Sequence, residues 1–456
     1  MEGDPQGGPE PQAPGLSGVR RLFLRLLGLV YLAAFASLAV QVEGLYGSRG
    51  ILPVTELLGF AASRLGPERY RLLPTLAWVS ASDGALLFLA WGGAALALLQ
   101  VACVAPRLVL LLLWAFYLSL VSPGRVFMGF QWDGLLLEAG LLAVFLAPGG
   151  VRPGAGAPPP PAYAVWLLRL LLFRLMFGSG AVKLLSGDPT WRSLDALRVH
   201  YETQPLPTWI GWYAHQLPVT VQRLSCGTMF LVELGLPLLI FAGRSGRLVA
   251  FAGFVLLQGT IALTGNYGFF NLLTVALAVL LLDDAALPRA LRPAVPAPVP
   301  APRPLVLWIR RAATVVPATL FLVSVVVFSS SLGLRVPWPA PVLVLEEALA
   351  PFRSVNAYGL FAVMTTSRPA ILVEGSRDGL EWRAYPFRFK PDDLDRPPGF
   401  VAPHQPRLDW QMWFAALGDC EANPWFLRFL DRLREGSPPV LGLLAGNPFP
   451  EGPPRY

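Results

Sequence analysis

The sequence predicts an α-helical multi-pass membrane protein with about nine transmembrane helices, followed by a small α+β C-terminal domain. Hydrophobic residues make up 54% of the 456 residues and charged residues only 14%, whereas soluble proteins carry about 25% charged residues. The apolar residues lie in long runs that the 46 prolines help to separate. So apolar a chain, with a net charge of only +7, is not typical of nucleic-acid binders. We therefore expect a lipid bilayer as a partner and no nucleic acid.

Nine apolar runs approach or exceed the length that crosses a hydrocarbon layer of about 30 Å. The predicted helices cover residues 22–42, 84–105, 108–122, 134–148, 163–185, 226–242, 248–264, 267–282 and 312–334. The first run has Arg20, Arg21 and Arg25 at its start, and it is longer than the core of a signal peptide, which has about 7–15 residues. This length favours a retained membrane helix over a cleaved signal peptide.

The basic residues of the short connections predict the orientation of the helices. Lys and Arg concentrate in the short cytoplasmic connections of membrane proteins. With the N-terminus in the cytoplasm, the short connections on the opposite side hold only Arg125. The cytoplasmic side then collects Arg20, Arg21, Arg107, Arg152, Arg244, Arg247, Arg289, Arg292, Arg303, Arg310 and Arg311.

The predicted helices divide the chain into three parts, and their odd number places the two ends of the membrane domain on opposite sides. Residues 1–18 are expected to form a disordered cytoplasmic tail, and residues 19–335 the membrane domain. The long loops at 43–83 and 186–225 then lie on the non-cytoplasmic side. Residues 336–456 lie there too, as an α+β domain.

The C-terminal part shows short segments with the pattern of strands. Residues 355–365, 370–374 and 380–390 are the expected strands, and the last two flank a turn at 376–379. We expect this hairpin to carry aromatic cross-strand partners. Two helices are expected to follow, at residues 407–417 and 424–434.

Besides Arg25 near the start of the first run, five charged residues lie inside the predicted membrane helices, where each charge is costly and therefore suggests a function. Because two of these helices are neighbours in sequence, Glu138 is expected to face Arg169 or Arg174. Structural ion pairing is the favoured explanation; the alternatives are snorkelling of Lys183 and Arg169 at the helix ends, or a path for substrate or protons. The candidate polar cluster comprises Glu138, Arg169, Arg174, Lys183 and Glu233. Between Arg174 and Lys183, a Gly-Ser-Gly cluster at 178–180 favours close helix packing.

Signatures of soluble-enzyme chemistry are absent from the sequence. It contains no Cys-x-x-Cys pair, no glycine-rich phosphate loop, no Gly-x-Ser-x-Gly and no His-Glu-x-x-His. A disulfide between Cys226 and Cys420 is conceivable, but separate thiols are favoured. His200, His215 and Glu202 have no recognised metal-ligand spacing. We expect no catalytic residues, no metal and no cofactor.

Several motifs resemble the lipase maturation factor family. They are FRLMFGSGAVKL (173–184), HYETQPLPTW (200–209), TGNYGFFN (264–271), LLDD (281–284) and RLDWQMWFAAL (407–417). The motifs occur in the family's order and extend over most of the chain. The segments QWDGLLLEAG and ETQ are more similar to the second of the family's two members.

The resemblance implies a multi-pass protein of the endoplasmic reticulum membrane, with a cytoplasmic N-terminus and a lumenal C-terminus. Such a protein assists the folding or assembly of secretory lipases, with lipoprotein lipase as an expected client. The candidate residues for client binding or for docking of a loop are His200, Tyr201, Glu202, Thr203, Gln204, Asp409, Trp410 and Trp413. Two alternatives stay open: a membrane enzyme of carboxylase-like layout, in which Lys183 is a desolvated base, and a transporter.

Overall fold

The computed structural model describes residues 15–154, 157–292, 314–393 and 395–456. Of the predicted cytoplasmic tail, residues 1–14 lie outside the described residues. Each of the nine predicted apolar runs overlaps a helix. These helices are α1 Ser17–Ala39, α5 Asp83–Val101, α6 Pro106–Val121, α7 Gln131–Leu146, α8 Ala162–Leu185, α12 Val219–Phe230, α13 Arg244–Thr264, α14 Phe270–Ala278 and α16 Val315–Ser331.

Five helical segments of the described chain are long and apolar enough to cross a membrane. They are Ser17–Ala39, Asp83–Val101, Ala162–Leu185, Val219–Phe241 and Arg244–Thr264. Three further apolar helices, among them α6 and α16, are shorter. The helical multi-pass class predicted from composition is therefore confirmed.

The central helix α1 packs closely against its neighbours α5 and α7. Gly93 of α5 lies against the ring of Phe35, and Gly140 of α7 lies against the hydroxyl of Tyr31, so a Cβ at either glycine would collide with the ring. Both aromatic side chains are fully buried. Glycine therefore brings these backbones together without leaving a cavity.

The two ends of α1 are fixed by residues far away in sequence. At its start, the Asp284 carboxylate accepts hydrogen bonds from the backbone N–H groups of Ser17, Gly18 and Val19, at 2.9–3.0 Å. A carboxylate at this end satisfies free N–H groups and matches the helix dipole. Just past the other end, the Gln41 amide donates to the backbone oxygen of Gln405 at 2.9 Å. With 23 residues, α1 spans about 34 Å between these two ends.

The sixth apolar run changes its helical type where it meets Pro237. Helix α12 continues as a π-helical turn over Leu231–Gly235 and a 3₁₀ helix over Leu236–Phe241. Proline has no N–H and disturbs the regular hydrogen-bond ladder, which explains the change. The π turn carries Glu233, and Gly180 of α8 lies against it. The close packing predicted for the Gly-Ser-Gly cluster is confirmed at this contact.

The two long connections, predicted as loops, are largely helical. The first, at 43–83, contains α2 Val42–Tyr46, α3 Val54–Leu65, η1 Gly66–Glu68, α4 Arg69–Leu72 and η2 Leu76–Trp78. The second, at 186–225, contains α9 Pro189–Arg192, α10 Ala196–Thr203, α11 Trp209–His215 and the start of α12. Further 3₁₀ turns are η3 Arg125–Met128, η6 Val279–Leu281, η7 Asp284–Ala286, η8 Arg289–Leu291 and η9 Ala350–Phe352.

The strand predictions for the C-terminal part were mostly wrong. Its described residues form one two-stranded antiparallel sheet, β1 Glu374–Ser376 with β2 Trp382–Ala384, in which Gly375 lies opposite Arg383. The hairpin is thus confirmed but much shorter than expected. Residues 355–365 are irregular because side chains of α7 and α8, rather than a neighbouring strand, bind their backbone.

The aromatic residues after the hairpin turn also have partners other than those predicted. Tyr385 packs on Phe449 and Phe387 on Phe429, both from the C-terminal segments. The two predicted helices are confirmed. The helices of this part are α17 Ala340–Leu349, α18 Arg407–Ala416, α19 Pro424–Arg434 and α20 Pro438–Leu441.

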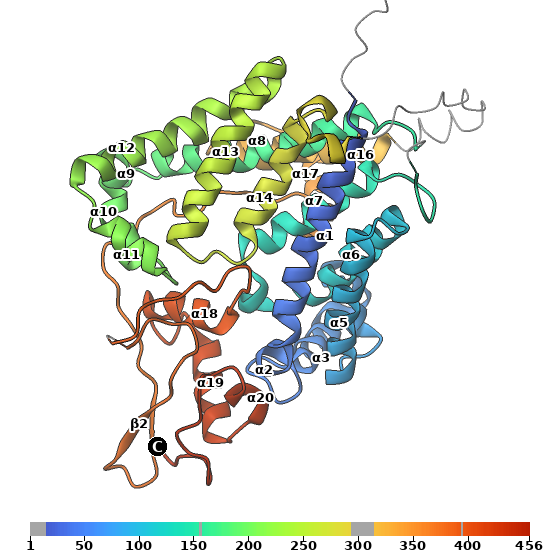
Figure 1. The fold of residues 1–456 in the computed structure, drawn as a ribbon. Coiled ribbons are helices and arrows are strands. Elements are labelled where there is room, and N and C mark those ends of the chain that lie inside the picture. The colour runs from blue at the N-terminus through green and yellow to red at the C-terminus, as the bar shows by residue number, and fades with distance from the viewer. Residues whose placement is uncertain (1–14, 155–156, 293–313, 394) are drawn as a thin grey trace, which may run out of the picture.

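Helices α18, α19 and α20 gather at one end of the helical assembly, close to α2 (Figure 1). This is the end at which α1 finishes, since Gln41 contacts the residues just before α18. Helices α18, α19 and α20 therefore lie at one end of the membrane helices and the start of α1 at the other, whereas α17 lies beside α16.

Candidate functional site

Three of the sequence motifs meet where the C-terminal part joins the membrane helices. Tyr267, in the turn between α13 and α14, donates its hydroxyl to Gln204 Oε1 at 2.9 Å and lies 3.0 Å from His200 Nε2. Its ring packs against Trp410 of α18, with ring centroids 5.9 Å apart. The TGNYGFFN turn thereby connects the HYETQ helix with the RLDWQMW helix.

His200 belongs to this junction as a neutral side chain. Burial, and secondarily the nearby Lys183 ammonium, lowers the pKa of His200 to about 4. The imidazole is therefore uncharged near neutral pH, and its contact with Tyr267 is a hydrogen bond between neutral groups. The other histidine of this region, His215, lies 3.6 Å from the exposed carboxylate of Glu202. The described residues contain no group of three or more His, Cys, Asp or Glu side chains arranged to hold a metal ion.

Most of the candidate segment 200–204 makes contacts within the chain. Gln204 donates to the backbone oxygen of Thr264 at 2.9 Å. The indole N–H of Trp413 donates to the backbone oxygen of Thr203 at 2.8 Å. Arg368 holds the backbone oxygen of Glu202 at 3.0 Å. These hydrogen bonds attach the segment to the rest of the chain through its backbone oxygens and the buried Gln204 side chain. The Glu202 side chain, 57% exposed, is the part that faces outward.

Asp409 binds a different segment of the chain from Trp410 and Trp413. It is buried and accepts hydrogen bonds from the backbone N–H groups of Phe389 and Lys390, each at 2.9 Å. Burial raises the pKa of Asp409 to about 6. Asp409 therefore holds the segment that follows the hairpin against α18, which is a contact within the chain.

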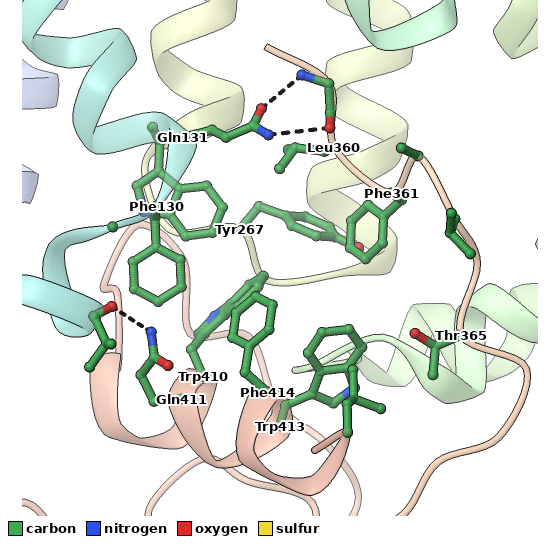
Figure 2. A pocket seen from close by; sticks show the side chains of 17 residues that line it. Phe130, Gln131, Tyr267, Leu360, Phe361, Thr365, Trp410, Gln411, Trp413 and Phe414 are labelled. Carbon is green, nitrogen blue, oxygen red and sulfur yellow. Dashed lines mark hydrogen bonds between the residues drawn. The ribbon is translucent and has the colours of Figure 1, made fainter. Parts of the chain in front are cut away.

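The junction encloses a cleft of about 600 Å³, which we call the aromatic cleft. Its lining comes from residues 126–132, 359–365 and 410–417, together with Tyr267. Figure 2 shows rings from all these segments facing one another across it. Trp410 and Trp413 were predicted from sequence as candidates. Phe130, Phe361 and Phe414 were not predicted from the sequence, although aromatic residues are frequent in the strings GFQW and WQMWF.

A fully buried ion pair lies next to the cleft. Both guanidinium nitrogens of Arg407 in α18 donate to the Asp133 carboxylate in α7, at 2.8 and 2.9 Å, and both side chains are 0% exposed. Asp133 also accepts the Tyr117 hydroxyl at 2.5 Å. This pair was not predicted from the sequence, because Asp133 lies one residue outside the predicted apolar run and Arg407 lies in the separate C-terminal part.

Of the two arginines expected near Glu138, Arg174 is the one that pairs with it, at 2.6 Å. The second oxygen of Glu138 accepts hydrogen bonds from the Asn356 backbone N–H at 2.8 Å and the Tyr358 hydroxyl at 2.7 Å. Arg169 instead donates to the backbone oxygen of Leu280 at 2.9 Å. Glu138 therefore binds an irregular segment of the C-terminal part to the membrane helices.

Lys183 pairs with Glu233 of the π turn, and its ammonium lies 2.7 and 2.9 Å from the two carboxylate oxygens. Both side chains are 7% exposed. A lysine held in this way is not a free base in an open pocket, which removes the observation that favoured a membrane enzyme. The charged residues that suggested a transporter also have partners: Glu138 pairs with Arg174, Glu233 pairs with Lys183, and Arg169 binds a backbone oxygen.

The three cysteines stay apart in the structure. Cys226 is buried, Cys420 is exposed and Cys103 is intermediate, and all three thiols are free. The conceivable Cys226–Cys420 disulfide is therefore not formed, because α12 and the loop before α19 hold the two residues in different environments.

Comparison with known proteins assigns these motifs to one family. The model of the lipase maturation factor transmembrane domain matches residues 18–289, and that of the lipase maturation factor C-terminal domain matches residues 354–456. Lipase maturation factor 2 from Mus musculus and from Homo sapiens are each 37% identical to the chain, over 96% of its length and 78% of theirs. Lipase maturation factor 1 from Bos taurus is 32% identical, over 99% of the chain and 87% of that relative. No solved structure matches.

These identities confirm that the chain is more similar to factor 2 than to factor 1. Both matched domains are present. The buried Arg407–Asp133 pair joins one to the other, and Arg174 and Glu138 of the transmembrane domain both bind the backbone of Asn356 in the C-terminal domain. The chain therefore belongs to the lipase maturation factor family.

Proposed function

We propose that this protein resides in the endoplasmic reticulum membrane and assists the folding and assembly of secretory lipases, with lipoprotein lipase among its clients. The names of its relatives support a role in lipase maturation. The observation that carries the proposal is the buried Arg407–Asp133 pair. Through it, the membrane helices hold α18 in a fixed position, which we propose lies outside the bilayer, where a secretory client would meet it.

The proposed orientation has the N-terminus in the cytoplasm and the C-terminal part in the lumen. Several arginines lie at the end of the assembly where α1 begins: Arg20 donates to the backbone of Pro158, and Arg244 pairs with Asp283, next to the Asp284 that binds the start of α1. Because basic residues favour the cytoplasmic side, this end is assigned to the cytoplasm. The opposite end of α1, with α18 beside it, then faces the lumen.

A glycosylation site placed in the hairpin turn tests this orientation. The sequence contains no Asn-x-Ser/Thr site of its own. The double change Asp378→Asn with Leu380→Thr creates one where Leu380 is 84% exposed. We expect a glycan that endoglycosidase H removes, as is typical of a protein retained in the endoplasmic reticulum. The matched site Val151→Asn with Pro153→Thr is expected to stay unmodified. Modification of the second site alone would reverse the proposed orientation.

The exposed side of the 200–204 segment is our candidate for client contact. Glu202 presents its carboxylate to solvent, while its backbone is held by Arg368. Replacement of this side chain by alanine therefore removes a surface charge without breaking the hydrogen bonds that dock the segment. Gln204, which is buried and bonded to Tyr267, serves only the docking.

Secreted lipase activity tests the function. In cells that lack their own lipase maturation factors, the protein is expected to restore active lipoprotein lipase to the medium. Glu202→Ala is expected to lower lipase activity per secreted lipase molecule while the variant's own abundance stays normal. Glu421→Ala changes an exposed carboxylate elsewhere in the C-terminal part and is the matched control.

Two outcomes would count against these proposals. If the intact protein, at normal abundance, restores no activity to any secretory lipase, the maturation function is wrong. If Glu202→Ala behaves like Glu421→Ala, the 200–204 segment does not contact the client, and the function itself is unaffected.

A further inference from the structure

We propose that the aromatic cleft is a binding site for a neutral glycerolipid, which inserts an acyl chain and places an ester carbonyl against the indole N–H groups of Trp132 and Trp410. This proposal does not depend on lipase maturation, because it concerns a ligand of the protein itself. It goes beyond the fold and the family because it rests on the cleft's volume, its lining and its unpartnered donors.

The size and the lining of the cleft suit an apolar ligand without charge. Its volume of about 600 Å³ falls within the range of about 300–1,000 Å³ that is typical of small-molecule sites. None of the described residues that line it is an Asp, Glu, Lys or Arg. A carboxylate or phosphate in the cleft would therefore lose its hydration without gaining a counter-charge. This excludes fatty-acid carboxylates and phosphate headgroups from its interior.

Two buried donors in the lining have no hydrogen-bond acceptor among the described residues. The indole nitrogens of Trp132 and Trp410 are both unpartnered, although these side chains are only 1% and 3% exposed. Their rings are 5.0 Å apart at an interplanar angle of 74°. In such an edge-to-face pair, at most one N–H faces the other ring, which is a weak acceptor. At least one buried donor is left for a ligand, since buried N–H groups usually have a partner.

The remaining amide groups of the lining favour an ester over a peptide. Gln131 uses both ends of its side chain on the backbone of Gly359, and Gln411 donates to the backbone oxygen of Val126. Figure 2 shows these amides turned toward the chain at the edges of the cleft. The fully buried side-chain atoms of the described lining that lack a partner are the two indole N–H groups, and both are donors. An ester carbonyl only accepts hydrogen bonds, whereas each peptide unit also brings an N–H that needs an acceptor.

The location of the cleft gives a lipid access from the bilayer. Its walls include η3, which connects α6 with α7, and the turn that connects α13 with α14. Both connections join apolar helices, so we place the cleft beside the membrane boundary, where an acyl chain enters it from the bilayer. Aromatic rings at this depth match the interfacial position that Trp and Tyr prefer.

Photolabelling of the intact protein in phosphatidylcholine nanodiscs tests the proposal. The probe is a diacylglycerol with a diazirine in one acyl chain, and the comparison probe is the diether analogue, which lacks the carbonyls. We expect the ester probe to label peptides covering residues 359–365 and 407–417. Ala362→Trp, which fills the cleft, is expected to reduce this labelling at least tenfold.

The two indoles are tested by a change that keeps the aromatic ring. Trp410→Phe and Trp132→Phe are each expected to weaken binding of the ester probe about three- to tenfold, as for one neutral hydrogen bond, and to leave the diether probe unaffected. Trp382→Phe, in the exposed strand β2, is the matched control and is expected to change nothing. Size-exclusion profiles matching the wild type establish that each variant is folded.

Three results would overturn the proposal. One is cleft labelling that Ala362→Trp does not reduce. Another is equal labelling by the ester and diether probes in the wild-type protein. The third is labelling of the cleft by a photoactivatable apolar peptide in place of the diacylglycerol, which would make the cleft a polypeptide site.

Discussion

Replacement of Arg407 by methionine is expected to abolish most of the folded protein. Arg407 donates a hydrogen bond to each of the two carboxylate oxygens of Asp133. Without it, the Asp133 carboxylate would be fully buried with no counter-charge. Removing one partner of a buried ion pair typically costs about 3–5 kcal/mol, which is a large part of the stability of most domains. The measurement is the monodisperse fraction after size exclusion of detergent extracts heated to increasing temperatures.

Two variants separate the loss of charge from other effects. The triple change Tyr117→Phe, Asp133→Leu and Arg407→Met removes every side-chain polar group of the cluster, so it is expected to recover much of the lost stability. Arg377→Met breaks an exposed pair with Glu451 and is expected to change stability by less than about 1 kcal/mol. A triple variant as unstable as the single one would show that shape, rather than charge, dominates at this junction.

Replacement of Glu138 by leucine is the second change expected to have a large effect. It removes the counter-charge of the buried Arg174 guanidinium and the acceptor of the Tyr358 hydroxyl and the Asn356 N–H. We expect a loss of about 3–5 kcal/mol from the unpaired charge. We also expect release of the irregular segment that begins after the exposed Arg353, measured as faster trypsin cleavage at that residue.

The control for Glu138 is another carboxylate that pairs with an arginine at the surface. Glu56 binds Arg428, and both side chains are nearly half exposed. Glu56→Leu is therefore expected to have little effect on stability. If Glu138→Leu left the cleavage rate after Arg353 unchanged, the carboxylate would not be what holds this segment against α7.

The sequence predicted the membrane helices well because their signal is local. A run of about 20 apolar residues can only be stable in a bilayer as a helix, since its backbone must bond within itself. The prediction failed for residues 355–365, whose alternating pattern indicates a strand. Their hydrogen-bond partners are side chains such as Glu138 and Gln131, more than 200 residues away in sequence, and periodicity carries no information about such partners.

The candidate site could be predicted only in part. Trp410 and Trp413 were found because they stand out in a conspicuous motif, and charged residues such as Lys183 were found because they interrupt apolar runs. Phe130 and Phe361 gave no comparable signal, since aromatic residues are common throughout this chain. That they share one cleft follows from the packing of α18 against η3 and α7.

The sequence by itself determined the class of this protein, its apolar helices and its family, because hydropathy and motifs are properties of short segments. The tertiary structure decided which charges pair, since ion pairs such as Arg407–Asp133 join residues 274 positions apart. It also decided that residues 200–204 dock through buried hydrogen bonds and that three aromatic segments enclose a cleft. Contacts of this kind depend on how the chain packs in space, which no short stretch of sequence specifies.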